Sequence, residues 1–257
     1  MSANSILPAN WPAPKNIHAF TTLRHGIGVS KSPFDEFNLG NRNGEQGDDP
    51  ETVKKNRELL VQEYSLPNKP HWLRQVHGVD VLRFENPPEL MGDFLRDEPV
   101  ADASLTSNTN VVLAVLTADC LPVLFCNEDG SEVAAAHAGW RGLADGMLEN
   151  TLSAMQIRPE NIMVWLGPAA GAQAYEIGVE VRDAFIRRDQ SAFTAFTPTR
   201  ENHWRVDLFQ LARMRLQAVG VTKIYGGDHC TISERDSFFS HRRDQRTGRM
   251  ASVIWMS

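Results

Sequence analysis

Two histidines and one cysteine have the types and surroundings that could support chemistry. His77, Cys120 and His137 each end or follow a strand-like run, and a chain-bending Gly or Pro comes within two residues of each. Two imidazoles and one thiolate suit zinc or copper, and such a set leaves a coordination position open for water or substrate. The same residues could instead form a Cys/His nucleophile pair. Both interpretations predict chemistry rather than scaffolding.

The spacing of these residues does not by itself bring them together. The gaps of 43 and 17 residues are longer than the close ligand pair that zinc sites usually contain. Small residues at Ala118, Ala138 and Gly139 would leave room around such a site. A metal there would lower the pKa of a bound water and supply hydroxide near neutral pH. Alternatively, His137 would deprotonate Cys120 for attack on an acyl or amidine carbon.

Arginines near the C-terminus are candidates for binding an anion. Residues 241–249 contain four arginines, in a chain whose formal net charge is −6. Because the planar guanidinium matches phosphate and carboxylate, Arg242, Arg243 or Arg57 could form a phosphate site. The alternative is a solvated loop whose arginines pair with nearby acids. The chain has no GxxxxGK[ST] motif and no GxGxxG after a strand, so neither ATP hydrolysis nor a dinucleotide cofactor is predicted.

The elements that must position these residues follow from hydrophobic periodicity and capping residues. Strands are predicted at residues 16–23, 72–76, 79–84, 101–105, 111–116, 121–126, 133–137, 162–166 and 223–225, with a closing strand in the tail. Helices are predicted at 50–64, 143–155, 179–188 and 208–219, the first capped by Asp49 and the last by Asp207. Strands adjoin one another without regular alternation with helices, which favours an α+β fold with a mixed sheet core.

Composition limits the class of protein. With 257 residues, 42% hydrophobic and 23% charged, the chain is expected to form a single domain over residues 1–257. The net negative charge predicts no general attraction to nucleic acid or to an anionic membrane. Residues 1–15 lack the apolar core of a signal peptide, and Asp119 and Pro122 interrupt the most apolar stretch. Three cysteines cannot all pair within the chain, so a reducing cytoplasm is expected.

An ordered set of motifs resembles one family over residues 16 to 256. It is the YfiH-type laccase-domain family, also called polyphenol oxidase, purine nucleoside phosphorylase YfiH-type or peptidoglycan editing factor. The matching motifs are Asn38-Leu39-Gly40, Gly47-Asp48-Asp49, Gln75-Val76-His77-Gly78, Thr117-Ala118-Asp119-Cys120-Leu121-Pro122, His137-Ala138-Gly139-Trp140-Arg141-Gly142, Gly167-Pro168, Tyr175-Glu176-Ile177-Gly178 and Phe239-Ser240-His241-Arg242-Arg243-Asp244.

The resemblance implies an α/β/β/α sandwich with mixed sheets, distantly similar to cysteine-hydrolase toxins. It also implies that His77, Cys120 and His137 hold a metal, usually zinc, beside the substrate. Members are described as phosphorolysing adenosine, inosine and methylthioadenosine, and as deaminating adenosine. A second description is peptidoglycan editing, in which a wrongly placed serine is removed from a UDP-muramyl precursor. The older laccase label implies copper and phenol oxidation.

These descriptions can be ranked by chemistry. The eight histidines include no HxH pair, so the trinuclear copper centre of a multicopper oxidase is not expected. The leading hypothesis is therefore a cytoplasmic, monomeric, zinc-dependent purine nucleoside phosphorylase with adenosine deaminase activity. The alternatives are an editing hydrolase that uses the same Cys/His site, a copper enzyme, and a binding module with a structural metal. The expected phosphate ligands are Arg242 and Arg57, and the candidates for further substrate contact are Gln75 and Asn38.

Overall fold

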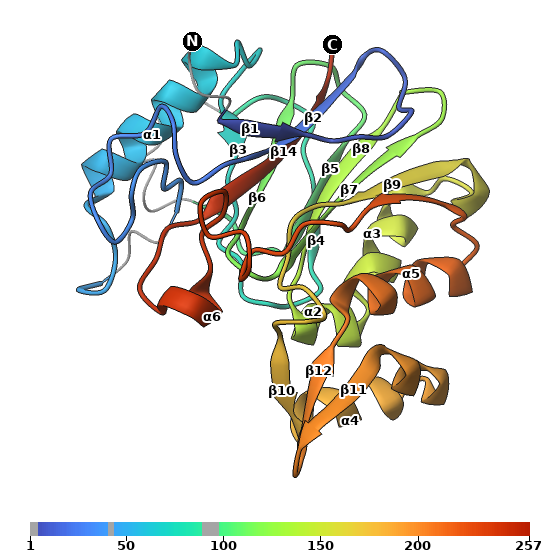
Figure 1. Ribbon diagram of the computed structural model, residues 1–257. Helices are drawn as coiled ribbons and strands as arrows, with labels where there is room; N and C mark the ends of the chain where they lie inside the picture. Colours follow the sequence, from blue (N-terminus) through green and yellow to red (C-terminus); the bar gives the residue numbers. More distant parts are fainter. Residues whose placement is uncertain (1–4, 41–43, 89–97) are drawn as a thin grey trace.

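The protein is built from two β-sheets that face each other, with helices on both outer sides, as Figure 1 shows. The structure, a computed structural model, describes residues 5–40, 44–88 and 98–257. The segment predicted to lack a signal peptide covers residues 1–15, and its first four residues lie outside the described range. Apolar side chains from both sheets form the central core, in which Leu113 and Ile254 of one sheet join Leu124 and Trp165 of the other.

The first sheet has five strands in the order β1-β2-β14-β6-β3. These are β1 (Ile6–Pro8), β2 (Ile17–Thr22), β14 (Met250–Met256), β6 (Val112–Thr117) and β3 (Pro70–His71). Helix α1 (Pro50–Glu63) covers its outer face, where buried Leu60 packs with Phe20 and Val253. The side chain of Asp49 accepts a hydrogen bond from the Thr52 N–H, so the predicted cap and start of this helix are confirmed.

The second sheet has six strands in the order β13-β9-β7-β8-β5-β4. These are β13 (Lys223–Gly226), β9 (Ile162–Leu166), β7 (Leu121–Asn127), β8 (Val133–Ala138), β5 (Ala103–Thr106) and β4 (Val81–Arg83). Its outer face is covered by α2 (Trp140–Asp145), α3 (Met147–Met155) and α5 (Leu208–Ala218). Both faces of β7 and β8 are buried, which explains their almost wholly apolar sequences.

A small lobe projects from the sandwich at the bottom of Figure 1. It consists of the three-stranded antiparallel sheet β10-β12-β11 and helix α4. Its elements are β10 (Glu176–Gly178), α4 (Val179–Ile186), β11 (Phe196–Arg200) and β12 (His203–Val206), with a 3-10 helix at Gln190–Ala195. The remaining helices are short: α6 (His241–Asp244) and a 3-10 turn at Pro159–Asn161.

The predicted fold class, α+β with mixed sheets in an α/β/β/α sandwich, is confirmed. The sequence predicted helix α4 of the small lobe, at 179–188, but not the three strands beside it. These strands are short, and four of the five β11 residues are exposed, so they lack the apolar run or the alternation that marks a half-buried strand.

The predicted strand at Trp72–Val76 is wrong. Strand β3 ends at His71, and beyond it only an isolated bridge joins Arg74 to Val100. The N–H groups of Val76 and the next two residues donate to the side chain of Asp102 instead of to a neighbouring strand. A buried carboxylate therefore takes the place of a strand partner.

The predicted single helix at 143–155 is also wrong, because Gly146 divides it into α2 and α3. Gly146 has φ 105°, a left-handed conformation that ends one helix and begins the next. The first of these helices starts at Trp140, directly after Gly139, and therefore earlier than predicted.

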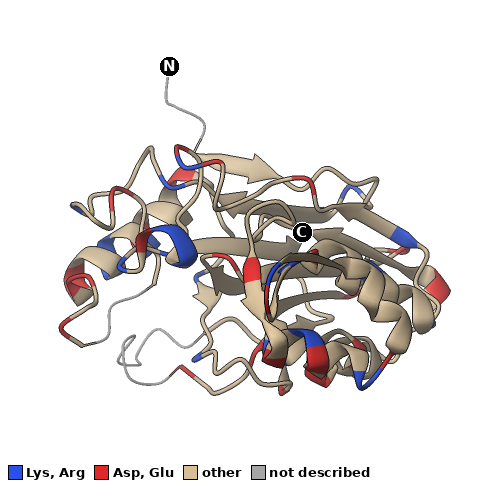
Figure 2. Cartoon of the chain, turned by 60° about the horizontal axis from the view of Figure 1, so that its bottom comes forward, with Lys and Arg blue, Asp and Glu red and all other residues tan. Residues whose placement is uncertain are grey.

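Charged residues are distributed over the whole surface. Figure 2 shows acidic and basic residues interspersed along the chain rather than collected on one face. Within the described ranges, none of the helices is both long and apolar enough to cross a membrane.

Replacing Gly146 with Ala should lower the free energy of unfolding by about 1–2 kcal/mol, because an L-residue is strained at this φ. The nearest atom to an added Cβ is 3.5 Å away, so crowding adds little. Urea unfolding would measure the change. Ser153→Ala, at an exposed position of α3, is the control and should shift stability by less than about 0.5 kcal/mol. Equal effects of the two substitutions would contradict this account of the helix break.

Candidate metal centre

The three residues singled out by type converge where the chain crosses between the two main sheets. His77 lies in the link from β3 of the first sheet to β4 of the second, and Cys120 lies in the short link from β6 to β7. His137 is in β8, which pairs with β7 so that it lies opposite Pro122. Pairing of adjacent strands therefore fixes His137 beside the cysteine, and the two crossings supply the other ligands.

The ligand atoms of His77, Cys120 and His137 all lie within 4.8 Å of one another. The two imidazole rings are 4.9 Å apart between centroids and meet edge to face at 76°. His137 is 3% exposed, Cys120 is partly exposed and His77 is exposed. The cluster is thus closed on the side of His137 and open to solvent on the side of His77.

Asp102 holds two of the three ligands in place from a fully buried position. Its Oδ1 is 2.8 Å from Nδ1 of His137 and accepts the backbone N–H of His77 at 2.9 Å. Its Oδ2 accepts the N–H groups of Val76 and Gly78, at 3.1 and 2.7 Å. An ionised carboxylate can only accept, so Nδ1 of His137 carries the proton and Nε2 is left to face the cysteine.

The cluster is arranged to hold a thiolate. Burial alone would raise the pKa of Cys120, but the neighbouring imidazoles of His137 and His77 outweigh it and lower this pKa to about 6. Burial would likewise lower the pKa of His137, but the Cys120 thiolate and the Asp102 carboxylate raise it to about 9. The hydrogen bonds from His137 and from the Gly78 and Val76 N–H groups overcome burial at Asp102 and hold its pKa below the ordinary value.

Gly139 leaves the space that the cluster needs. A Cβ added at this position would lie 2.8 Å from the His77 ring and 3.1 Å from the Cys120 sulfur. The glycine has φ −62° and ψ 159°, which any residue adopts, so the space and not the backbone requires glycine here. Two imidazoles, one thiolate and this cleared space fit a zinc or copper ion with an open position.

Asp119 connects the link that carries Cys120 to the C-terminal segment. Its Oδ1 accepts the Thr231 hydroxyl and its Oδ2 accepts the Arg242 N–H, both at 2.6 Å. With φ 92°, Asp119 is in a conformation that non-glycine residues rarely adopt, at the tight turn that precedes Cys120. The carboxylate therefore fixes Arg242 relative to the cysteine.

Gln75 and Asn38, the candidates for substrate contact, form hydrogen bonds with other parts of the protein: Gln75 with the backbone, and Asn38 with the backbone and with Asp48. The Gln75 amide both donates to and accepts from the backbone of Leu116, at 2.8 Å each way. The Asn38 oxygen accepts the N–H groups of Gly40 and Arg249, and its nitrogen donates to Asp48. In this structure both residues brace the segments around the cluster.

Arg57, an expected phosphate ligand, lies in α1 and is engaged there. Its guanidinium donates to the Leu39 carbonyl at 2.9 Å and to Glu98 at 2.8 Å, and it lies over the Trp72 ring. None of these partners belongs to the cluster. The contacts that Arg57 makes therefore do not connect it to His77, Cys120 and His137.

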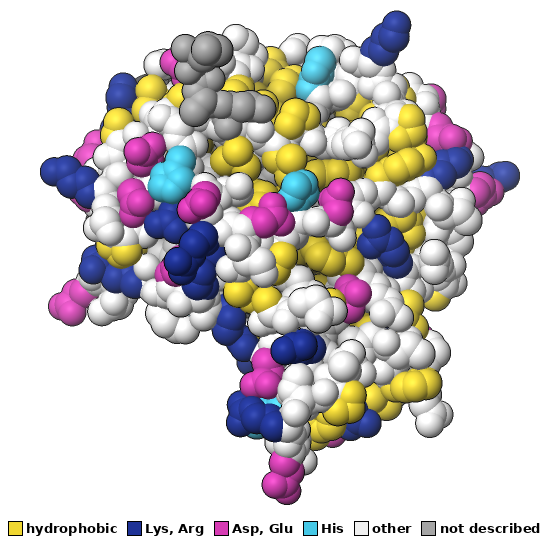
Figure 3. All heavy atoms as spheres, viewed as in Figure 1, with side chains coloured by type: hydrophobic (Ala, Val, Ile, Leu, Met, Phe, Trp, Pro, Cys, Tyr) yellow, Lys and Arg dark blue, Asp and Glu magenta, His cyan; other side chains and the backbone are white. Residues whose placement is uncertain are grey.

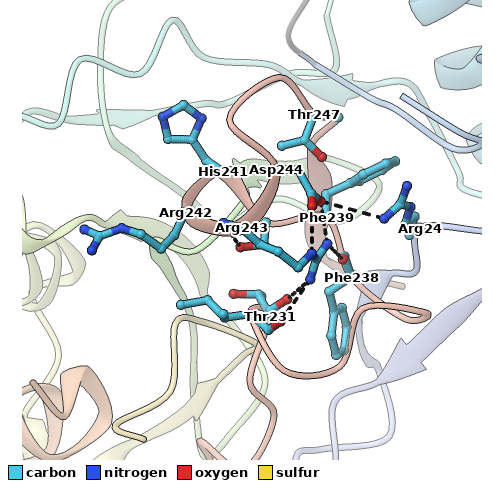
Figure 4. A network of polar contacts seen from close by, with 12 residues as sticks. Arg24, Thr231, Phe238, Phe239, His241, Arg242, Arg243, Asp244 and Thr247 are labelled. Atoms are coloured by element: carbon cyan, nitrogen blue, oxygen red, sulfur yellow. Dashed lines mark hydrogen bonds and ion pairs between the residues drawn. The ribbon is translucent and has the colours of Figure 1, made fainter. Parts of the chain in front are cut away.

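The four arginines of the tail have different partners. Figure 4 shows Arg243 pointing into a polar network, where it donates to the Thr231 and Phe238 carbonyls and pairs with Asp244. In the same view Arg242 points away from that network. Arg246 lies over the ring of Phe34 and donates to the backbone of Gln46. Arg249 donates to two carbonyls of its own loop, and its charge acts on Cys120 and Asp119.

Sequence reasoning missed two residues that shape the cluster. Asp102 stands between alanines in a strand-like run, and a lone carboxylate in such a buried run was the available signal. Tyr175 lies close enough to Cys120 for the thiolate charge, together with burial, to raise its pKa to about 12. Nothing in the spacing of Tyr175 predicts that proximity.

Comparison with known proteins gives close similarity over almost the whole chain. A family model described as multi-copper polyphenol oxidoreductase laccase matches residues 18–257. A Xylella fastidiosa protein (strain Temecula1) named purine nucleoside phosphorylase is 54% identical over 253 residues, 98% of this chain and 96% of its own length. An Escherichia coli K12 protein named purine nucleoside phosphorylase YfiH is 49% identical over 253 residues, 98% of this chain and 99% of its own.

Solved structures share the fold along the full length. Neisseria meningitidis protein NMB0706 superimposes with a TM-score of 0.89 at 46% identity, covering 99% of this chain and 100% of its own. YlmD from Geobacillus stearothermophilus gives 0.90 at 32% identity, covering 100% of this chain and 97% of its own.

The lowered pKa of Cys120 predicts how the metal-free protein reacts with iodoacetamide. Alkylation of Cys120 requires the thiolate, so its rate should rise with pH through a midpoint near 6 and fall away below it. His137→Gln removes a positive neighbour and should move the midpoint upward. Mass spectrometry of the labelled peptides would follow the reaction. Cys126 is the internal control, because it is buried and burial raises its pKa to about 12. An unshifted Cys120 midpoint near 9 would contradict the geometry.

Proposed function

The chain belongs to the multi-copper polyphenol oxidoreductase laccase family, with YfiH-named relatives, and we propose that it acts as a metal-dependent purine nucleoside phosphorylase. The observation that carries the proposal is the open cluster of His77, Cys120 and His137. It lies in a chain that matches proteins named purine nucleoside phosphorylase from end to end. The uninterrupted family match over residues 18–257 also supports a single domain.

The reaction we propose is phosphorolysis of adenosine, inosine and methylthioadenosine. A phosphate oxygen forms a bond to C1′ of the ribose while the C1′–N9 bond breaks, and its electron pair leaves with the purine, which takes up a proton. The products are the free base and ribose 1-phosphate (5-methylthioribose 1-phosphate from methylthioadenosine). We also propose deamination of adenosine, in which water adds at C6 of the purine and ammonia leaves.

The chain's own residues prepare the site for this chemistry. Asp102 orients the His137 ring and keeps its Nε2 directed at the cluster, and the imidazoles keep Cys120 as a thiolate. A zinc ion held by the three side chains would supply Lewis-acid chemistry at its open position. We propose zinc as the metal, with copper as the alternative, because tetrahedral sites with imidazole and thiolate ligands suit zinc. Exposed His77 marks the side from which a nucleoside can approach.

Phenol oxidation by a multicopper centre has less support from the residues. A trinuclear copper centre needs many histidines, whereas the described part of the chain groups only His77, Cys120 and His137 as a set of potential ligands. A cytoplasmic location suits the proposal, because nucleosides and phosphate are available there and a reducing compartment keeps Cys120 from being oxidised.

Cys120→Ala should abolish phosphorolysis by the purified protein, because it removes the thiolate ligand while leaving the buried strands on either side intact. Mass spectrometry of adenosine incubated with and without phosphate would measure the products. We expect the unchanged protein to form adenine and ribose 1-phosphate only when phosphate is present, and Cys120→Ala to form neither. Cys230→Ala, outside the cluster, is the matched control and should retain activity.

The same experiment can refute the proposal. Equal turnover by Cys120→Ala and the unchanged protein would show that the reaction does not require the cluster. Absence of product from the metal-loaded protein with adenosine, inosine and methylthioadenosine would exclude the phosphorylase, and would favour hydrolysis of a UDP-muramyl precursor at the same site.

A further inference from the structure

A polar pocket of about 300 Å³ lies between the sandwich and the small lobe. Helix α2 contributes Trp140 and Arg141, the start of the small lobe contributes Tyr175, and the C-terminal segment contributes Arg242. The β11–β12 hairpin closes it with Arg200 and His203. Figure 3 shows basic side chains, with acidic ones among them, over the junction of the lobe with the rest of the molecule.

Three connections place this pocket beside the metal cluster. Trp140 directly follows Gly139, where an added Cβ would contact the His77 ring and the Cys120 sulfur. Tyr175 lies within the electrostatic reach of Cys120. The backbone N–H of Arg242 donates to Asp119, the neighbour of Cys120. These connections indicate that a group bound in the pocket would lie near the cluster, on the side of Cys120.

The guanidinium groups of two arginines in this pocket have no acidic partner among the described residues. The Arg242 guanidinium lies over the Tyr175 ring, 4.8 Å from its centroid, and one N–H donates to the Glu176 carbonyl. The Arg141 guanidinium lies over the Trp140 ring at 4.2 Å. The third, Arg200, is neutralised by Glu176 at 2.9 Å. The pocket also contains the carboxylate of Glu180, so its three arginines exceed its two acids by one charge.

Stacking on an aromatic ring holds each guanidinium in one plane while its remaining N–H groups stay available. Two such forks at one pocket match the oxygens of a tetrahedral anion, which they can bind with charge-assisted hydrogen bonds. Phosphate offers more acceptor oxygens to the two forks than a carboxylate does.

We propose that this pocket is the phosphate subsite of the protein, and that Arg141 and Arg242 bind inorganic phosphate there as the co-substrate. The inference rests on the proposed phosphorolysis and goes beyond it by naming the ligands and the lobe that completes the site. Asp119 is a positioning residue, because its bond to the Arg242 N–H sets the distance between the phosphate and the cluster. Arg57 takes no part in this subsite.

Binding of inorganic phosphate to the metal-loaded protein, measured by isothermal titration calorimetry, tests the assignment without requiring turnover. Arg141→Gln and Arg242→Gln should each raise the dissociation constant for phosphate by about tenfold or more, since each removes charged donors. The KM for phosphate in adenosine phosphorolysis should rise by a similar factor. Arg158→Gln is the matched control, because Arg158 is exposed and lies outside the pocket. Circular dichroism would check that all variants are folded.

The outcomes separate this subsite from the proposed function. Phosphate binding that depends on both arginines, in a protein without phosphorylase activity, would support the subsite and overturn the phosphorylase. Unchanged phosphate binding and KM in both variants of an active enzyme would overturn the subsite. A third arm compares adenosine 5′-monophosphate with adenosine: if only the nucleotide binds through the arginines and inorganic phosphate does not, the co-substrate assignment is wrong.

Discussion

The buried carboxylate of Asp102 is the constraint on which the candidate centre depends. It directly precedes β5, is fully buried, and accepts four hydrogen bonds: one from the His137 ring and three from the backbone of residues 76–78. A buried charge is costly unless its oxygens are satisfied, and here satisfying them organises the site. The Asp102 side chain thereby fixes the tautomer of His137 and holds the backbone that carries His77.

The location of the centre follows from the way the chain connects its two sheets. Links between the facing sheets at β3–β4 and β6–β7 carry His77 and Cys120, and they come together at one edge of the sandwich. Asp119 turns the second link with a positive φ, and its carboxylate attaches that link to the C-terminal segment. The fold therefore brings residues from four distant parts of the sequence, near 77, 120, 137 and 242, to one region.

The sequence predicted the parts of this molecule that depend on local pattern. The apolar runs at β6, β7 and β9 and the Asp49 cap of α1 were found because periodicity and capping act over a few residues. The motif resemblance indicated the sandwich and the three candidate ligands, which the fold brings together. The features that were missed depend on partners distant in sequence. Trp72–Val76 has the pattern of a strand, but the N–H groups of Val76 and His77 donate to the Asp102 side chain instead of to a neighbouring strand. Asn38 and Gln75 looked available for substrate, but their amides bond to the backbone of Arg249 and Leu116, which only the fold brings near.

Titration of the metal-free protein with cobalt(II), in the unchanged chain and in Asp102→Asn, tests most directly whether this arrangement is a metal centre. We expect one cobalt per chain, with an absorption spectrum of a tetrahedral ion that includes a thiolate charge-transfer band. In Asp102→Asn the same band should appear only at about 10–100-fold higher free cobalt, because the His137 ligand is no longer oriented. A spectrum of six-coordinate cobalt without a thiolate band in the unchanged chain would contradict the account, as would equal affinity in the two proteins.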